Sequence, residues 1–183
     1  ASYFYLRKAV AADQVDADTF YAYNYSVPGL FISTDKGATW TLQYSGHITS
    51  NDSFSGGIVT VPGKSGNLFW FTGKLGGTNN GVVAPTANAF LEHSTDHGQH
   101  WNACPGVLEV TGVALGRPRN AGDYPAVYIS GWSTPGNVFG IYRSEDECQT
   151  WTLLGTAPLP GSYLQMWGVS TASMDTFGRF YGG

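Results

Sequence analysis

Charged side chains are scarce in this 183-residue sequence, at 12% of residues against about a quarter in a typical globular domain. The nine Lys and Arg residues are fewer than the thirteen Asp and Glu residues, and they form no basic run. A nucleic-acid-binding protein needs clustered Lys and Arg to neutralise phosphates. We therefore expect no nucleic-acid partner.

Long apolar runs are also missing. No stretch approaches the roughly 20 apolar residues of a membrane-spanning helix, so we expect no membrane partner. The first residues, ASYFYLRK, lack the charge-then-apolar order of a signal peptide. The expected chain is therefore cytosolic, or mature and trimmed, or a piece of something longer.

Cysteine is limited to Cys104 and Cys148, which permit at most one disulfide; the sequence leaves open whether they are bonded or free. Three of the four histidines, His93, His97 and His100, lie within eight residues of one another. Zinc sites can have this spacing, but His97 and His100 occupy spacer positions of a turn motif, where exposed polar residues are expected. We predict no metal site and no cofactor.

Glycine and aromatic residues, by contrast, are abundant, with 25 glycines and 15% aromatic residues. Together with many Ser and Thr residues, they favour short strands joined by tight turns. The composition therefore predicts an all-β protein.

A motif of the form S-x-D-x-G-x-x-W recurs along the chain. It reads STDKGATW at 33–40, STDHGQHW at 94–101 and SEDECQTW at 144–151, where Cys148 replaces the glycine. Repeats of 50 to 60 residues are typical of stacked or radial units. The motif positions are Ser33, Asp35, Gly37 and Trp40; Ser94, Asp96, Gly98 and Trp101; and Ser144, Asp146 and Trp151.

The residue types of the motif suit a hairpin turn. An Asp side chain can accept backbone N–H groups, a Gly can adopt a positive φ, and a Trp can pack a large ring against the hairpin. Asp35, Asp96 and Asp146 could also be interpreted as catalytic carboxylates. Because three equivalent turns cannot converge on one substrate, we predict that these residues are structural.

Each motif lies between two strand-like segments, and two further strand-like segments precede this pair. Each unit therefore contains four short antiparallel strands. Such units arranged radially are β-propeller blades. We predict about three and a half blades, at approximately 1–48, 49–106, 107–156 and, for the half blade, 157–183. Since propellers typically need four to eight blades, we expect the remaining blades to come from the same or another chain.

The motif resembles the Asp box, or BNR repeat, of sialidases, sortilin-like receptors and several glycosidases. More of the chain is similar to glycoside hydrolase family 74, the xyloglucan-specific endo-β-1,4-glucanases. The similarity lies in KAVAADQVDADTFYAYN followed by GLFISTDKGATW, in YPAVYISGW followed by GIYRSEDECQTW, and in the closing DTFGRFYGG. These segments resemble consecutive parts of that family's C-terminal propeller, and the match spans nearly the whole chain.

The resemblance implies a secreted, extracellular enzyme that hydrolyses β-1,4-glucans with inversion, using one aspartate from each of two propellers. It places both aspartates outside the matched region, so we assign no catalytic residue to this chain and expect it to be inactive alone. The implied partner is a β-glucan such as xyloglucan. The sequons at Asn24 and Asn51, which we place in exposed loops, weakly favour secretion.

We call the four strands of each unit A to D in chain order. The loops that join strand B to strand C, and strand D to strand A of the next unit, share the propeller face where ligands usually bind. On that face we predict Trp132 as a sugar-stacking platform, although it could equally pack against its own blade, with Tyr163 and Tyr25 as weaker candidates. Four carboxylates outside the motifs could reach the same face. They are Asp52, Glu109, Asp123 and Asp175, and for Asp123 an ion pair with Arg117 or Arg119 is the favoured interpretation.

Three functions compete at this point. The first is a portion of a secreted xyloglucanase that forms one wall of the polysaccharide cleft. The second is a non-catalytic Asp-box propeller that binds a glycan or a peptide. The third is a sialidase, which needs three clustered arginines, and the five arginines here show no such arrangement.

Overall fold

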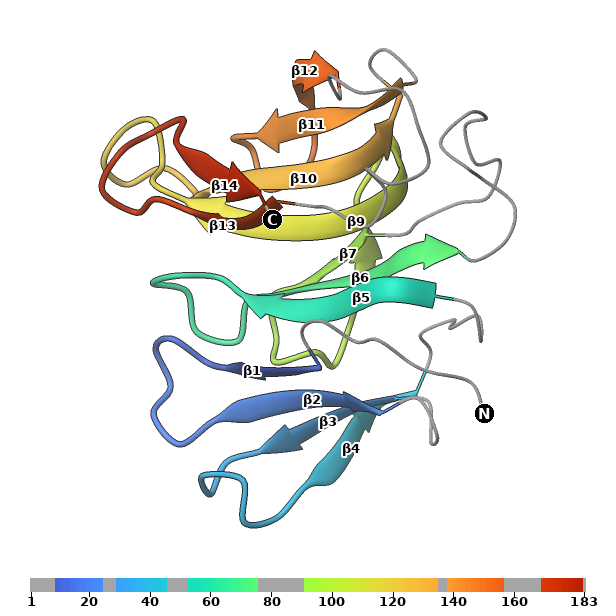
Figure 1. Ribbon diagram of the computed structural model, residues 1–183. Coiled ribbons are helices and arrows are strands. Elements are labelled where there is room, and N and C mark those ends of the chain that lie inside the picture. The colour runs from blue at the N-terminus through green and yellow to red at the C-terminus, as the bar shows by residue number, and fades with distance from the viewer. Residues whose placement is uncertain are drawn as a thin grey trace.

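The structure is a computed structural model that describes residues 9–24, 29–45, 53–75, 91–134, 138–156 and 169–182. These residues form strands and turns, and they include no helix long and apolar enough to cross a membrane. Their fourteen strands pair antiparallel in four separate sheets (Figure 1).

The strands follow chain order within each sheet. The first sheet contains β1 (Val10–Ala12), β2 (Phe20–Asn24), β3 (Gly29–Ser33) and β4 (Thr41–Tyr44). The second contains β5 (Ser53–Thr60), β6 (Leu68–Leu75), β7 (Leu91–Ser94) and β8 (Asn102–Ala103). The third contains β9 (Val107–Gly116), β10 (Ala126–Ser133), β11 (Val138–Ser144) and β12 (Thr152–Thr156). The fourth contains β13 (Val169–Ala172) and β14 (Phe180–Gly182).

The three motif segments, which we call the S-x-D turns (33–40, 94–101 and 144–151), join the third strand of a sheet to its fourth. The serine that opens each turn ends the third strand, and it pairs with an equivalent residue of the second strand in all three sheets. These pairs are Phe20 with Ser33, Leu68 with Ser94, and Val127 with Ser144. The repeated motif therefore has the same strand register in all three sheets.

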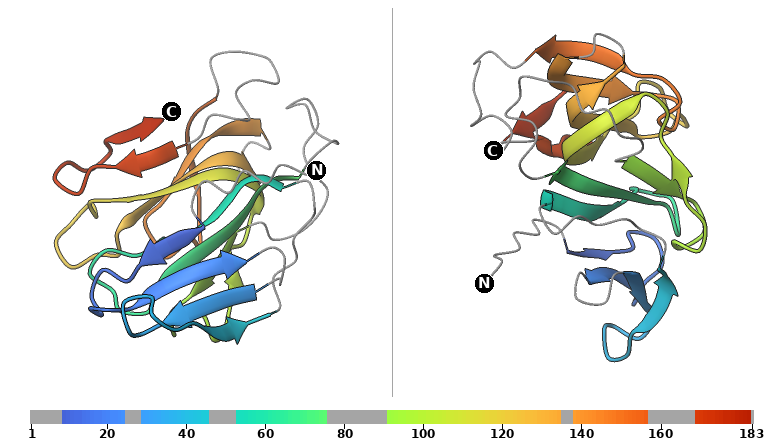
Figure 2. Two further views of the ribbon diagram at one scale, coloured as in Figure 1. Left: turned by 60° about the horizontal axis from the view of Figure 1, so that its bottom comes forward. Right: turned by 90° about the vertical axis from the view of Figure 1, so that its right-hand side faces the viewer.

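The sheets stack face to face, as the views in Figures 1 and 2 show. We call the interfaces the first seam (sheets one and two), the second seam (sheets two and three) and the third seam (sheets three and four). Each seam has its own apolar cluster, because each sheet is too thin to enclose a core. Tyr21 and Leu68 meet at the first seam, Phe69 and Val113 at the second, and Tyr128 and Val169 at the third.

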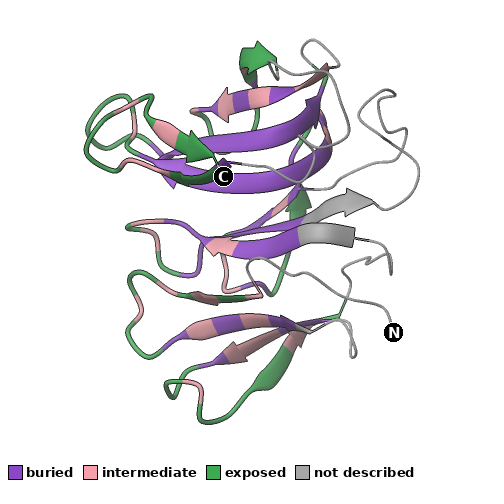
Figure 3. Cartoon of the chain, in the orientation of Figure 1, coloured by how far each residue is buried: buried purple, intermediate pink, exposed green. Residues whose placement is uncertain are grey.

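Burial follows from this stacking (Figure 3). Every residue of β10 is buried, because the third sheet is covered on both faces. The first sheet is covered on one face only by described residues, and its Val10 and Leu42 are 59% and 51% exposed. The predicted all-β architecture of propeller blades is confirmed, with no ring closed within the described part of the chain.

Some strand limits differ from those predicted. Strand β9 begins at Val107 rather than residue 110, directly after Gly106, whose positive φ of 75° turns the chain between two sheets. Residue Ser133 at the far end of β10 pairs with Val107, so the longer β9 is paired from end to end, with two register shifts in between. The four sheets lie within the four blade ranges expected from the sequence.

Candidate functional site

The first S-x-D turn is held by its serine and aspartate. Ser33 Oγ accepts the Gly37 N–H at 2.8 Å and donates to Asp35 Oδ1 at 2.8 Å. The Asp35 carboxylate also accepts the Thr39 N–H at 2.8 Å and the Thr39 hydroxyl at 2.6 Å. Hydrogen bonds from Thr39 and Ser33 lower the pKa of Asp35 to about 2, so this carboxylate is ionised.

The second and third turns repeat this geometry around Asp96 and Asp146. Burial alone would raise the pKa of Asp96, but hydrogen bonds from His100 and Ser94 lower it to about 2. Each aspartate therefore serves its own turn, and the three turns belong to three different sheets. They provide no pair of carboxyl groups that faces a common substrate bond.

Two consecutive residues of each turn have a left-handed backbone, and in the second and third turns the second of them faces the preceding sheet. A β-carbon at Gly98 would lie 2.2 Å from Leu30 Cδ2 of the first sheet, so glycine alone fits there. The third turn has a cysteine at the equivalent position. The residues and φ values are Lys36 63° and Gly37 86°, His97 60° and Gly98 82°, and Glu147 56° and Cys148 64°.

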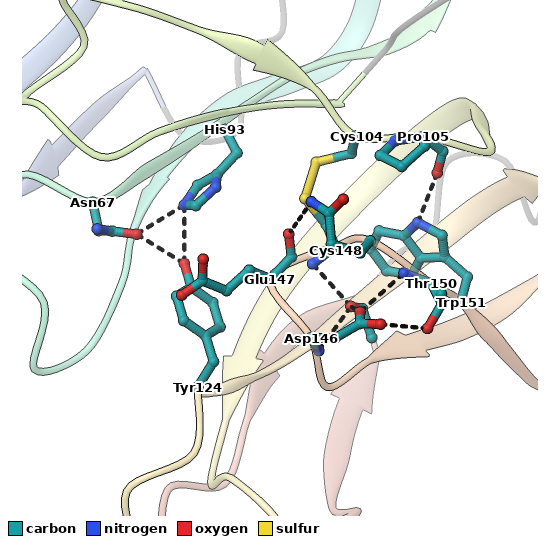
Figure 4. Close-up of a disulfide and its surroundings, with 12 residues drawn as sticks. Asn67, His93, Cys104, Pro105, Tyr124, Asp146, Glu147, Cys148, Thr150 and Trp151 are labelled. Carbon is teal, nitrogen blue, oxygen red and sulfur yellow. Dashed lines mark hydrogen bonds between the residues drawn. A yellow bond between two sulfur atoms is a disulfide. The ribbon is translucent and has the colours of Figure 1, made fainter.

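A disulfide joins Cys104, just after β8, to Cys148 in the third S-x-D turn (Figure 4). The two Cα atoms are 5.6 Å apart, within the normal range for a bonded pair. The question that the sequence left open is thereby answered: the bond crosses the second seam. Trp151 crosses it too, since its Nε1 donates to Pro105 O at 3.1 Å, whereas Trp101 donates within its own turn to Gly98 O.

A buried polar cluster lies beside this disulfide (Figure 4). Asn67 Oδ1 is 2.8 Å from His93 Nε2 and accepts the Tyr124 hydroxyl at 2.9 Å. Burial lowers the pKa of His93 to about 4, so the ring is neutral near pH 7 and donates its Nε2–H to Asn67. The ring also stacks on Phe69 with 4.5 Å between centroids. This cluster was not predicted, because its members come from separate turns and strands.

The best platform candidate, Trp132, lies near the end of β10 and is 6% exposed. It is opposite Glu109 of β9 on one side and Phe139 of β11 on the other, and its ring contacts Phe139 edge-on at 6.4 Å. Its Nε1–H is buried and has no hydrogen-bond partner among the described residues. Neither the face of this ring nor its N–H is open to a sugar in this arrangement.

The other carboxylate candidates do not gather on one face. Glu109 is fully buried in β9, whereas Asp123 and Asp175 lie in turns at the S-x-D end of the sheets. The predicted ion pair of Asp123 does not form among the described residues. Asp123 instead accepts hydrogen bonds from Asn120, and Arg119 pairs with Glu145 at 2.6 Å.

The remaining predicted positions add little geometry. Tyr25, Tyr163, Asn51 and Asp52 lie outside the described residues. Asn24 is the last residue of β2, where it pairs with Gly29, and its proposed glycosylation stays a prediction.

A shallow depression of about 280 Å³ lies at the outer edge of the second seam. It is lined by Pro105, Gly106, Thr134, Gln149, Thr150 and Trp151. No charged side chain lines it, and its one aromatic ring, Trp151, is 7% exposed, so it offers no evident catalytic chemistry.

Comparison with models of known protein families finds no match. Over 143 residues, or 78% of its length, the chain is 32% identical to xyloglucanase Xgh74A of Acetivibrio thermocellus. The structure also superposes on the crystal structure of the Niastella koreensis GH74 enzyme, with a TM-score of 0.66 and 25% identity over 94% of this chain. The chain is a relative of the GH74 xyloglucanases.

Two further relatives agree with this GH74 relationship. The chain is 28% identical over 147 residues to a probable oligoxyloglucan-reducing end-specific xyloglucanase of Neosartorya fischeri. A GH74 xyloglucanase of Xanthomonas campestris shares the fold, with a TM-score of 0.67 at 19% identity over 95% of this chain. The resemblance predicted from the sequence is confirmed.

The chain spans only part of these GH74 relatives. It covers 14% of the Acetivibrio thermocellus protein and 16% of the Neosartorya fischeri protein. It likewise covers 22% of each of the two crystallised chains.

Proposed function

We propose that this chain forms part of the C-terminal propeller of a secreted xyloglucan-degrading endo-β-1,4-glucanase and contributes one wall of its polysaccharide cleft. The observation that carries this proposal is the 32% identity to a xyloglucanase over 143 residues. The shared fold with a GH74 enzyme over 94% of the chain supports it.

The chemistry we propose for the intact enzyme is hydrolysis with inversion. One carboxylic acid protonates the leaving oxygen while a carboxylate, roughly 6.5–9.5 Å away, activates a water on the opposite side of the bond. The carboxylates of the S-x-D turns are committed to those turns and Glu109 is buried within a sheet, so the catalytic pair is expected elsewhere in the enzyme. This chain alone should therefore leave xyloglucan intact.

Within the described residues, we assign the glucan contact to Trp132. Its buried Nε1–H lacks an acceptor, and an unsatisfied buried donor costs about 1–3 kcal/mol. A sugar hydroxyl oxygen could satisfy this donor once the residues that cover it move aside on binding, so we assign to Trp132 a hydrogen bond rather than a stacking contact. Tyr25 and Tyr163 remain proposed contacts on the same face.

Secretion is supported by the Cys104–Cys148 disulfide, since such bonds persist in oxidising compartments. We propose that the enzyme acts outside the cell, where its polymeric substrate is found.

Affinity electrophoresis in gels that contain xyloglucan tests this function. The expected result is retarded migration of the protein, weakened by Trp132→Phe, which keeps an aromatic ring but removes the N–H. A parallel assay for new reducing ends should show none from this chain alone. Unretarded migration of the wild type would remove the glucan-binding role.

The same two assays, affinity electrophoresis and the release of reducing ends, test the second candidate, a non-catalytic propeller. Because the sequence relatives are xyloglucanases, we expect hydrolysis once the chain is part of a protein with the remaining propeller blades. Retardation without hydrolysis in that complete protein would favour a purely binding role.

A further inference from the structure

Asp13, Asp16 and His97 bring three possible metal ligands together at the first seam. One ligand atom from each lies within 4.8 Å of the others. The two aspartates belong to the turn between β1 and β2, and His97 belongs to the second S-x-D turn of the next sheet. His97 was predicted to be an exposed spacer, but its side chain is only 34% exposed and lies against the first sheet.

Tyr21 determines which nitrogen of His97 carries hydrogen. The Tyr21 hydroxyl donates to Asp13 Oδ2 at 2.9 Å and lies 2.7 Å from His97 Nδ1. A hydroxyl has one hydrogen, and the ionised Asp13 carboxylate can only accept. Nδ1 must therefore carry a hydrogen and donate it to the Tyr21 oxygen. In a neutral ring, Nε2 then presents a lone pair.

That lone pair faces a second acceptor. His97 Nε2 is 3.5 Å from Asp16 Oδ2, a distance at which Nε2 either carries a proton that pairs with the carboxylate or shares a cation with it. The spacing suits two ligands of one ion. Zinc bonds of about 2.0–2.2 Å to nitrogen and oxygen in a tetrahedral site place neighbouring ligand atoms roughly 3.3–3.5 Å apart.

In the described structure, the two carboxylates of the cluster are surrounded by hydrogen-bond donors, including the Ser65 hydroxyl on Asp16 Oδ2, and by His97 rather than by Lys or Arg side chains. Among the described residues, no Lys or Arg forms an ion pair with Asp13 or Asp16. Two other carboxylates in turns do have such partners: Asp18 pairs with Lys36 at 3.6 Å in the first sheet, and Glu145 pairs with Arg119 in the third. A divalent cation would supply the missing positive charge at the cluster.

The surroundings hold the imidazole in place. Asp13 accepts four hydrogen bonds, including the Gly66 N–H at 3.0 Å, so its main effect on His97 is to orient the ring through Tyr21. A β-carbon on Gly66 would lie 2.8 Å from His97 Nε2, so the ring rests directly over that backbone. Such outer partners of a histidine ligand fix its tautomer and orientation.

We propose that Asp16 and His97, oriented by Asp13 through Tyr21, bind one divalent transition-metal ion, with Zn²⁺ as the best match to a nitrogen and carboxylate set. The ion links the first and second sheets. This proposal is independent of the glucan-binding role.

Isothermal titration of the EDTA-treated full chain with ZnCl₂ tests it. One Zn²⁺ per chain is expected. Because Tyr21→Phe removes the hydroxyl that accepts Nδ1–H and donates to Asp13 but leaves both proposed ligands, it should weaken binding about tenfold, the usual effect of losing an outer partner. Asp16→Asn and His97→Gln remove ligands and should weaken binding further.

His100→Gln is the matched control. His100 also lies beside an aspartate, with its Nδ1 2.6 Å from Asp96 Oδ2, but that pair is confined to one exposed turn. Its loss should leave Zn²⁺ affinity unchanged. Equal losses in His97→Gln and His100→Gln, or no Zn²⁺ binding by the wild type, would overturn the proposal.

Imidazole ¹⁵N NMR gives a test that needs no variant. Zn²⁺ should shift the Nε2 signal of His97 and leave its Nδ1 protonated. A His97 ring that is doubly protonated at pH 8 and insensitive to Zn²⁺ would mean that a proton, and no metal ion, lies between His97 Nε2 and Asp16 Oδ2. The metal site would then be rejected.

Discussion

The first and second seams are built on the same plan but are fastened differently. At each seam, the turn residue two positions after the aspartate contacts the preceding sheet. At the first seam this residue is Gly98, directly under Leu30. At the second it is Cys148, bonded to Cys104. One position of the repeat can thus serve either as a packing contact or as a covalent link.

The polar contacts at the two seams differ as well. Each seam pairs a tyrosine with a histidine across the sheets, Tyr21 with His97 and Tyr124 with His93. In the first pair Tyr21 is buried but His97 is partly exposed beside two carboxylates, while both members of the second pair are buried next to an amide. The first seam is therefore suited to a cation, whereas the second is suited to a neutral ring. Four predictions test this contrast.

Removing the disulfide should have the largest effect. Cys148→Ser opens a loop of 44 residues, and the loss of this constraint on the unfolded chain corresponds to about 4 kcal/mol. Urea unfolding in oxidising buffer measures the change. Dithiothreitol should lower the stability of the wild type by a similar amount and leave the variant unchanged. A variant as stable as the oxidised wild type would contradict a structural role for the bond.

Acid should weaken the second seam through His93. The pKa of His93 falls from 6.5 to about 4 on folding, so the unfolded chain binds more protons between these values. The free energy of unfolding should therefore decrease as pH falls from about 6.5 to 4, by on the order of 3 kcal/mol. Urea unfolding at several pH values measures it. His93→Gln cannot titrate, so its stability should fall less over this window; an unchanged slope would show that other groups are responsible.

A methyl group at Gly98 should weaken the first seam by about 2 kcal/mol, through backbone strain and overlap with Leu30. Gly37→Ala is the matched control, since Gly37 has the same turn position and a positive φ of 86°. Its β-carbon would meet only Trp40, at 3.7 Å. Thermal unfolding of both variants should show the larger loss for Gly98→Ala. Equal losses would mean that the strain lies in the turn and not at the seam.

The exposed ion pair of the first sheet should matter least. Lys36 and Asp18 are 3.6 Å apart, with side chains 75% and 48% exposed. Solvent screens such pairs, so Lys36→Ala should change the free energy of unfolding by less than about 0.5 kcal/mol. The same urea assay applies. A larger loss would show that the outer edge of the first sheet contributes more to stability than its exposure indicates.

Contacts that repeat with the motif were predictable from the sequence. Strands, hairpins and their order follow from alternating apolar segments around each S-x-D turn, and the serine register is the same in all three sheets. The local roles of Ser33, Asp35 and Gly37 follow from side-chain chemistry within eight residues. Such features need no knowledge of how the sheets are arranged.

Contacts between sheets were not predictable in the same way. Tyr124 is 31 residues from His93, and Tyr21 is 76 residues from His97, so nothing in the local pattern pairs them. The burial of Trp132 likewise depends on its neighbours across the sheet, Glu109 and Phe139. His97 was predicted to be exposed because all spacer positions of the turn were treated as equivalent. The spacer between the aspartate and the glycine, His97, instead contacts the preceding sheet.

The bond between Cys104 and Cys148 also changes what a break in the chain can do. Strands β9, β10 and β11 lie between the two cysteines, inside a covalent ring. A single cut by a protease at any peptide bond from 105 to 147 therefore leaves the two pieces joined. A protein exposed to extracellular proteases would keep its third sheet attached to the second after such damage.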